Sequence, residues 1–274
     1  MKVRFWGVRG SVAVSGARYA ATGGNTSCIE LEYDGHRLVL DGGTGLRALG
    51  EELGFAPCQL TVLFSHYHWD HIQGVPFFGP AYNPKSQVTF AGFPSTDGPG
   101  VRETLDIQMR PPTFPVGLST LAGAHEFVDL TAGDDYHSGP FRVRSVQLPH
   151  PNGVVALRVE ADGRSVVYAT DTEHGLNGID RRLVELADGT DLLIHDAQYR
   201  NEEYLGKSGP PRRGWGHSTF DEAVDAAVES GARKLALYHH DPARDDVGID
   251  DIETASRQRF AGAFAAREGA ELIL

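Results

Sequence analysis

The feature that most constrains this chain is a stretch of seven residues, 65–71, with the sequence S-H-Y-H-W-D-H. It places His66, His68, Asp70 and His71 within six positions. Neutral imidazoles and carboxylates are the ligands that zinc, iron and manganese take in proteins. His66 and His68 alternate and share one face of an extended segment, while Asp70 and His71 follow after a turn and can point to an adjacent position. One loop can therefore hold two metal ions side by side.

The flanking sequence predicts that this stretch is a loop at the end of a strand. Residues 59–64 form a short apolar, β-branched run that is typical of a buried strand. Residues 72–76 can begin a helix, but Pro76 limits its length. A rigid scaffold can aim the side chains of such a loop into a cleft. A lone histidine is usually solvated or structural, whereas four clustered ligand-type side chains after a strand favour a metal site.

The pattern H-x-H-x-D-H after a strand resembles the signature of the metallo-β-lactamase fold superfamily. Other residues expected in this superfamily follow in order, each just after a strand-like run. These residues are Asp41, His150, Asp171 and His239. The resemblance covers nearly the whole chain and implies an α/β fold, a four-layer αββα sandwich of two mixed β-sheets flanked by helices. Because no linker interrupts the sequence, we expect a single domain over residues 1–274, with an irregular insertion at about 93–123.

The resemblance also implies a dinuclear metal centre, built from one group of residues for each metal and one bridging carboxylate. The two groups and the bridge are His66, His68 and His150; Asp70, His71 and His239; and Asp171. A hydroxide between the metals would attack the substrate, because two metals lower the pKa of water and stabilise the attacking and leaving oxygens. We expect two divalent ions, with zinc preferred and manganese or iron left open. Asp41 would support the ligand loop rather than bind metal.

One ligand assignment has a local alternative. His239 and His240 are adjacent in the sequence Y-H-H-D-P. We predict His239, because it directly follows a strand and matches the H-x-x-P pattern of the family, while strand alternation points His240 the other way. His174 is the best candidate among the remaining histidines to line the cleft, and His195 has no assigned role.

Two further motifs resemble those of ribonuclease Z, a member of the superfamily that cleaves phosphodiesters. Residues 194–198, I-H-D-A-Q, resemble its H-E-A-T motif, and residues 216–219, G-H-S-T, resemble its H-S-T motif. The resemblance implies that Asp196 and His217 help proton transfer to the leaving group, since a carboxylate can keep a paired histidine protonated. The alternative for His217 is an ordinary residue before a helix. The expected catalytic residues are therefore Asp196, His217 and the metal ligand Asp70.

The leading functional hypothesis is a dinuclear phosphodiesterase that hydrolyses a small phosphodiester, with a cyclic nucleotide as one candidate. Residues 5–11, F-W-G-V-R-G-S, and 23–28, G-G-N-T-S-C, resemble bacterial members described as cyclic-nucleotide phosphodiesterase-like. This glycine-rich segment is equally compatible with a loop at the active-site rim and with an ordinary turn. The alternatives are a tRNA 3′-processing endoribonuclease and a metal-bound sensor without turnover.

Composition bears on the partners. The formal net charge of −12 and the lack of a long basic arm argue against a nucleic-acid substrate. A small anionic substrate remains compatible, because divalent metals can reverse the local charge. No apolar run is long enough to span a membrane, no signal peptide is recognisable and the two cysteines form no C-x-x-C pair. We therefore expect a cytoplasmic protein with no membrane partner, and the resemblance allows a homodimer.

Local patterns predict elements outside the metal loop. Residues 218–230 form the clearest helix, with a capping box between Thr219 and Glu222 and an end at Gly231. Residues 249–268 are also predicted to be helical. Within the insertion, apolar side chains either cap the cleft or pack at the surface, and these are Phe114, Leu118 and Leu121.

Overall fold

The computed structural model describes residues 1–94, 98–175 and 178–274. Within these residues the strands form two mixed seven-stranded sheets. The first sheet has the order β14-β1-β2-β3-β4-β5-β6, and the second has the order β13-β12-β11-β10-β9-β8-β7. In each sheet a parallel block, β3 to β6 or β10 to β13, continues into antiparallel strands. Residues 95–97 of the expected insertion lie outside the described residues.

The first sheet is built from the N-terminal strands and the last strand of the chain, and the second sheet from the strands between them. The first sheet contains β1 (Lys2–Gly7), β2 (Cys28–Tyr33), β3 (His36–Leu40), β4 (Gln59–Phe64), β5 (Gln87–Gly92), β6 (Ala124–Asp129) and β14 (Glu271–Ile273). The second contains β7 (Tyr136–Ser138), β8 (Phe141–Leu148), β9 (Val154–Ala161), β10 (Arg164–Ala169), β11 (Leu192–Asp196), β12 (Leu235–Tyr238) and β13 (Ala263–Ala265). The last strand, β14, therefore returns to the sheet formed by the N-terminal half and pairs with β1.

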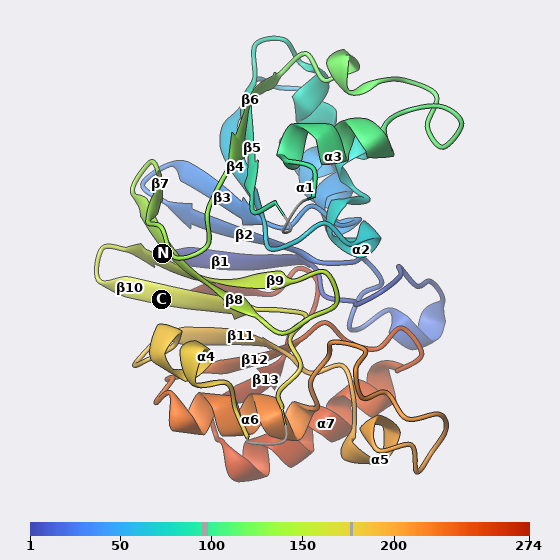
Figure 1. Cartoon of the computed structure of the whole chain (residues 1–274), viewed down its shortest axis with the longest axis vertical. Coiled ribbons are helices and arrows are strands. Elements are labelled where there is room, and N and C mark those ends of the chain that lie inside the picture. Colours follow the sequence, from blue (N-terminus) through green and yellow to red (C-terminus); the bar gives the residue numbers. More distant parts are fainter. Residues whose placement is uncertain (95–97, 176–177) are drawn as a thin grey trace.

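The helices cover the outer faces of the two sheets, as Figure 1 shows. They are α1 (Gly45–Leu53), α2 (Trp69–Ile72), α3 (Val101–Gln108), α4 (Arg181–Leu186), α5 (Asn201–Tyr204), α6 (Phe220–Glu229) and α7 (Asp246–Arg259). Helices α1 and α3 contact the first sheet, while α4 and α6 contact the second. The four layers expected from the sequence are thus confirmed. The prediction of a single domain stays a prediction.

Three apolar clusters separate these layers. The middle cluster lies between the sheets and includes Phe5 and Leu31 of the first sheet with Leu157 and Ile194 of the second. A second cluster joins the second sheet to its helices, and a third joins the first sheet to its helices. Burial of these side chains stabilises the sandwich by removing apolar area from water. Both faces of the central strands are covered, so the polar side chains of the site emerge only at the strand ends.

The capping box predicted for α6 is present. The Thr219 side chain accepts a hydrogen bond from the backbone N–H of Glu222, and the Glu222 carboxylate accepts one from the backbone N–H of Thr219. The helix predicted over residues 249–268 is wrong in its second half. Helix α7 ends at Arg259, and residues 263–265 form β13, which pairs in parallel with β12. Sheet pairing overrides the helical tendency of this alanine-rich segment, because it satisfies the edge of β12.

The insertion at about 93–123 is not irregular throughout its described residues. It contains α3 and a short 3-10 helix, Leu118–Thr120. Leu118 and Leu121 are buried in the cluster between the first sheet and its helices, and Phe114 packs against that cluster. These side chains therefore contribute to the core of the layer and do not cap the cleft.

Candidate metal centre

The side chains predicted to bind metal converge from the ends of four strands. Residues 65–68 follow β4, and His68 lies at the N-terminus of α2, which carries Asp70 and His71. His150 follows β8, Asp171 follows β10 and His239 directly follows β12. Parallel strands present their carboxyl ends at one edge of a sheet, so residues distant in the sequence meet there.

The structure brings all seven predicted ligands into two groups that share one residue. The groups are His66, His68, His150 and Asp171, and Asp70, His71, Asp171 and His239. In each group the candidate ligand atoms lie within 4.8 Å of one another. Asp171 belongs to both groups, as the predicted bridge requires. His240 lies outside them, since its Nε2 contacts the carbonyl oxygen of Ala266 at 3.0 Å.

Hydrogen bonds behind the ligands determine which ring nitrogen of each histidine faces the cluster. Nδ1 of His71 donates to Asp41 Oδ2 at 2.7 Å, which leaves Nε2 as the atom with a free lone pair. The Ser65 hydroxyl donates to Asp41 at 2.8 Å, and Nδ1 of His66 contacts that hydroxyl at 3.1 Å. Because the hydroxyl proton is already used, Nδ1 of His66 must be the donor in this contact. His66 and His71 therefore both direct Nε2 toward the cluster.

The other histidines are held in the same way from more distant segments. Nδ1 of His150 donates to the carbonyl oxygen of Gly216 at 2.9 Å. Nδ1 of His239 donates to Gln198 Oε1 at 3.3 Å, and its Nε2 lies 3.2 Å from Asp70 Oδ2. His68 is turned differently, because its Nδ1 faces Nε2 of His150 at 3.0 Å. The ligand atoms thus have fixed directions before any cation binds.

The residues at this site fit a bound cation. Nε2 of His66 and Nε2 of His71 are both buried and have no hydrogen-bond partner in the described part of the chain. A buried polar atom without a partner is costly, and two that point at carboxylates indicate that another group belongs between them. Imidazole nitrogens with carboxylate oxygens form a donor set suited to zinc, manganese or iron.

The electrostatics of the cluster also favour positive charge. Burial lowers the pKa of His71, but Asp171, Asp70 and Asp41 outweigh this effect and raise the pKa well above 6.5. Burial raises the pKa of Asp171, but His239 and His71 outweigh it and lower the pKa well below its usual range. The carboxylates therefore hold a proton on His71 that an incoming cation would displace, so metal binding would release protons.

Three residues of the site that follow strands adopt a left-handed backbone conformation. The φ angles are 60° at Asp41, 52° at Asp171 and 58° at His239. Each residue lies just beyond a strand, where the chain must turn sharply to aim the side chain into the cleft. Such conformations are uncommon outside glycine and asparagine and cluster at functional sites.

The two predicted proton-transfer residues lie next to the second group. Nδ1 of His217 donates to Asp196 Oδ2 at 2.8 Å and lies 3.8 Å from Asp171 Oδ1. The ring of His217 stacks on that of His239 with centroids 5.0 Å apart. Burial lowers the pKa of His217, but the Asp196 carboxylate outweighs it and raises the pKa to about 9. This pairing keeps a proton beside the metal ligands.

Two further histidines, His174 and His195, are hydrogen-bonded to each other behind Asp196, and this pairing was not predicted. The backbone N–H of Asp180 donates to Nδ1 of His174 at 3.3 Å, so His174 carries its own proton on Nε2. That proton is donated to Nε2 of His195 at 3.1 Å, and Nδ1 of His195 donates to the carbonyl oxygen of Asp196 at 2.7 Å. The two neutral rings hold the backbone from which the Asp196 carboxylate projects.

The glycine-rich N-terminal segment reaches the site, which decides between the two alternatives left by the sequence. The backbone N–H of Ser11 donates to Asp70 Oδ2 at 2.7 Å. Gly10 packs so closely against the ring of His239 that a Cβ there would overlap it. Gln198 links both parts, because its amide also donates to the Ser11 hydroxyl at 3.2 Å.

Sequence reasoning missed several supporting groups. Tyr168 donates its buried hydroxyl to Asp41 Oδ2 at 2.7 Å, and Ser65 donates twice to the same carboxylate. Gln198 stands in the I-H-D-A-Q motif, but nothing in that motif indicates that it contacts His239. Gly216 acts through its backbone carbonyl oxygen, a contact that no pattern of side chains in the sequence can indicate.

Comparison with known proteins agrees with this geometry. The family model described as the beta-lactamase superfamily domain matches residues 36–240. The chain belongs to the metallo-β-lactamase superfamily. A protein named Ribonuclease Z from Natronomonas pharaonis is 26% identical over 288 residues, covering 87% of this chain and 86% of that protein. Such relatives support the ribonuclease Z-like branch of the superfamily.

Two solved structures share the fold. The metallo-β-lactamase fold protein YhfI from Bacillus subtilis superposes with a TM-score of 0.72 at 20% identity, covering 99% of this chain and 98% of that chain. A diphosphatase from the PhnP family also gives a TM-score of 0.72, at 18% identity, covering 100% of this chain and 97% of that chain. This superfamily fold implies divalent metals, and the chain is a hydrolase of the superfamily.

Two expectations about partners have different outcomes. Among the described residues, no helix combines the length and the apolar character needed to cross a membrane. The expectation that nucleic acid is not a substrate finds no support, because similar proteins are named Ribonuclease Z.

Proposed function

We propose that this protein is a dinuclear metal-dependent phosphodiesterase that hydrolyses a small phosphodiester. The observation that carries the proposal is the placement of the His217–Asp196 pair against two groups of metal-ligand type that share Asp171. A dinuclear site alone is compatible with many hydrolytic reactions. A protonated histidine beside it adds the group that a phosphodiester with an alkoxide leaving group requires.

In this proposal His66, His68, His150 and Asp171 would hold the first metal, and Asp70, His71, His239 and Asp171 would hold the second, with zinc as the preferred ion. When bound, two divalent ions lower the pKa of water and offset the charge of a phosphoryl group. The chain itself fixes the ligand directions, through Asp41 for His71 and through Gly216 for His150. Ser11 further orients Asp70 through its backbone N–H.

The proton would come from the His217 ring, which Asp196 orients. The hydrogen bond from Nδ1 of His217 to Asp196 leaves Nε2 as the other proton-bearing atom of the imidazolium. His217 is largely buried, with 8% of its surface exposed. The role assigned to His217 is to donate this proton to the leaving oxygen, while Asp196 stabilises the charged ring before the transfer.

A tRNA 3′-processing activity is the second candidate, favoured by the similarity to proteins named Ribonuclease Z. The net charge of −12 argues for a small substrate, because RNA binding relies on phosphate contacts with basic side chains. The two activities are separated by substrate. A tRNA precursor with a 3′ trailer should be cut by an enzyme of this class only if a basic surface grips it.

The test is hydrolysis of bis-p-nitrophenyl phosphate by metal-stripped protein, with zinc or manganese added back. We expect metal-dependent turnover that vanishes in Asp171→Ala and falls only modestly in His217→Ala, because p-nitrophenolate leaves without a proton. Turnover would justify a panel of cyclic nucleotides and a tRNA precursor. A protein that binds two metals but shows no turnover of any phosphodiester would contradict the proposal and favour a metal-bound sensor.

A further inference from the structure

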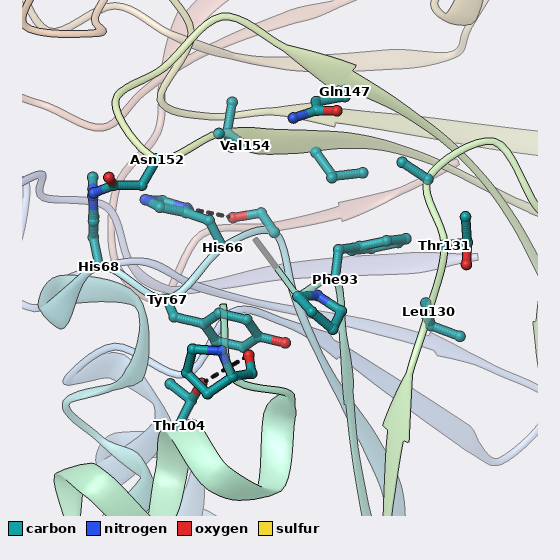
Figure 2. A pocket seen from close by; sticks show the side chains of 16 residues that line it. His66, Tyr67, His68, Phe93, Thr104, Leu130, Thr131, Gln147, Asn152 and Val154 are labelled. Atoms are coloured by element: carbon teal, nitrogen blue, oxygen red, sulfur yellow. Dashed lines mark hydrogen bonds between the residues drawn. The ribbon is translucent and has the colours of Figure 1, made fainter. Parts of the chain in front are cut away.

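A cavity of about 580 Å³ opens from the first metal group and extends away from it. It begins at His66 and His68 and runs between the ends of the two sheets, with α3 on one side. Figure 2 shows Tyr67 and Thr104 on one wall, with Val154 and Gln147 on the opposite wall. The volume falls within the range of about 300–1,000 Å³ that small-molecule sites occupy.

The lining of this cavity, called here the neutral cavity, carries no formal charge among the described residues. Apart from the two histidines at its inner end, its side chains are aromatic, aliphatic or uncharged polar groups. Phe93 and Tyr67 supply ring faces, and Gln147, Asn152 and Thr131 supply neutral donors and acceptors. A charged group buried here would lose its hydration without gaining an ionic partner, which is unfavourable. The neutral cavity therefore selects for an uncharged ligand.

The surroundings of His150 have a different chemistry. A second cavity of about 610 Å³ begins at His150 and is lined by Glu173, Glu222 and Arg213, and it is called the charged cavity. His68 and His150, which border the two cavities, are joined at 3.0 Å. An uncharged cavity and a charged one thus both open at the first metal group, so the two arms of a phosphodiester placed there would enter different environments.

The polar groups of the neutral cavity point to a ring with a hydrogen-bonding edge. The buried hydroxyl of Tyr67 has no hydrogen-bond partner in the described part of the chain. That oxygen has almost no accessible surface, so other atoms of Tyr67 line the cavity. Aromatic side chains stack on planar rings, and carboxamides such as that of Gln147 can both donate to and accept from a ring edge. A nucleobase combines these properties, being planar, uncharged and lined with donors and acceptors.

We propose that the neutral cavity binds the nucleobase of a nucleoside phosphodiester, so that the substrate is a nucleotide ester with its base on the His66–His68 side. Tyr67 and Phe93 would contact the base faces, and Gln147 and Thr131 would contact its edge. The inference rests on the proposed phosphodiesterase function only where it assigns a phosphodiester group to the substrate. Binding of the base itself does not depend on turnover.

The first test measures base binding without a phosphate. Thymidine, which is uncharged, would be titrated into the metal-loaded protein and followed by saturation-transfer difference NMR, with 2-deoxyribose as the ligand lacking a base. We expect transfer to the protons of the base and no transfer to 2-deoxyribose. Absence of thymidine binding would overturn the proposal.

Two variants locate the binding. Gln147 and Thr131 are exposed residues that line the neutral cavity, so Gln147→Trp and Thr131→Trp should fill it without disturbing the core. Gln87→Trp is the matched control, because Gln87 is exposed on β5 and does not line this cavity. We expect the thymidine Kd to rise at least about tenfold in both cavity variants, the scale of a blocked apolar subsite. An unchanged Kd in both cavity variants would contradict the assignment.

The second test separates this inference from the proposed function. With bis-p-nitrophenyl phosphate as substrate, thymidine should raise KM without lowering kcat, and this inhibition should disappear in Gln147→Trp. If the wild-type protein binds thymidine but hydrolyses no phosphodiester, the proposed function fails and the base site stands. If turnover occurs and thymidine neither binds nor inhibits, the base site fails and the proposed function stands.

Discussion

The carboxylate of Asp41 accepts a hydrogen bond from Nδ1 of His71 at 2.7 Å, and both side chains are fully buried. The same carboxylate receives the Tyr168 hydroxyl and both donors of Ser65. Asp41 therefore connects the second sheet, through Tyr168, to the loop that carries the metal ligands. This arrangement fixes Nε2 of His71 as its ligand atom.

Replacing the Asp41 carboxylate should weaken metal binding without removing a ligand. In Asp41→Asn the zinc affinity should fall about ten- to a hundredfold, because partners of this kind orient a metal-binding histidine and increase its basicity. Competition with a chromophoric chelator measures the affinity. Tyr168→Phe is the control, since it removes a donor to the same carboxylate. It should lower the free energy of unfolding by about 2 kcal/mol while two metals remain bound. Equal zinc affinity in Asp41→Asn and wild type would contradict this role.

A methyl group at Gly10 should disturb the second metal group selectively. The Cβ of Gly10→Ala would overlap the His239 ring, which has no exposed surface and little freedom to move. We expect the affinity for one of the two metals per protein to fall, with a loss of turnover. Gly79→Ala is the matched control, because nothing lies within 4 Å of a Cβ there. Elemental analysis after dialysis gives the metal stoichiometry, and two tightly bound metals in Gly10→Ala would show that the contact is unimportant.

Loss of the His217 ring should matter most for poor leaving groups. For His217→Asn we expect kcat to fall by about 10²–10⁴ with a substrate that expels an alkoxide, such as a cyclic nucleotide. The fall should be much smaller with bis-p-nitrophenyl phosphate, whose leaving group departs without a proton. His36→Asn, at an exposed position, serves as the control. A similar fall for both substrates, with metals still bound, would argue that His217 does not donate the proton.

The buried His174–His195 pair should make stability depend on pH. Burial lowers the pKa of His174 from 6.5 to about 4. Between these values the unfolded chain binds a proton that the folded protein does not, so the free energy of unfolding falls as the pH is lowered. His174 should contribute roughly 2 kcal/mol to this loss between pH 7 and pH 5.

Urea unfolding of metal-free protein at both pH values measures the effect. His174→Gln retains a donor toward His195 but no longer titrates, so its stability difference between the two pH values should be smaller than that of the wild type. His137→Gln, at an exposed position, should keep the wild-type difference. The assignment fails if His174→Gln and wild type lose the same stability on acidification.

The metal loop could be predicted from the sequence because its ligand-type residues are close neighbours in the chain. Four ligand-type residues within residues 65–71, after an apolar run that forms β4, needed no distant partner to be recognised. The same holds for α6, whose capping box joins Thr219 to Glu222 within one turn. Resemblance to a known superfamily extended this to the residues at other strand ends, and the structure gathers those residues in one place.

Only the tertiary structure decided which atoms face the cluster and what surrounds it. Asp41, Gly216 and Gln198 select the ring nitrogens of three histidines from segments far away in the sequence. Pairing with β12 turned the end of a predicted helix into β13, because backbone hydrogen bonding at a sheet edge outweighs weak local propensity. The neutral and charged cavities likewise arise where separate loops meet. Residue types and short spacings are read along the chain, whereas directions, tautomers and cavities depend on contacts between segments that only folding brings together.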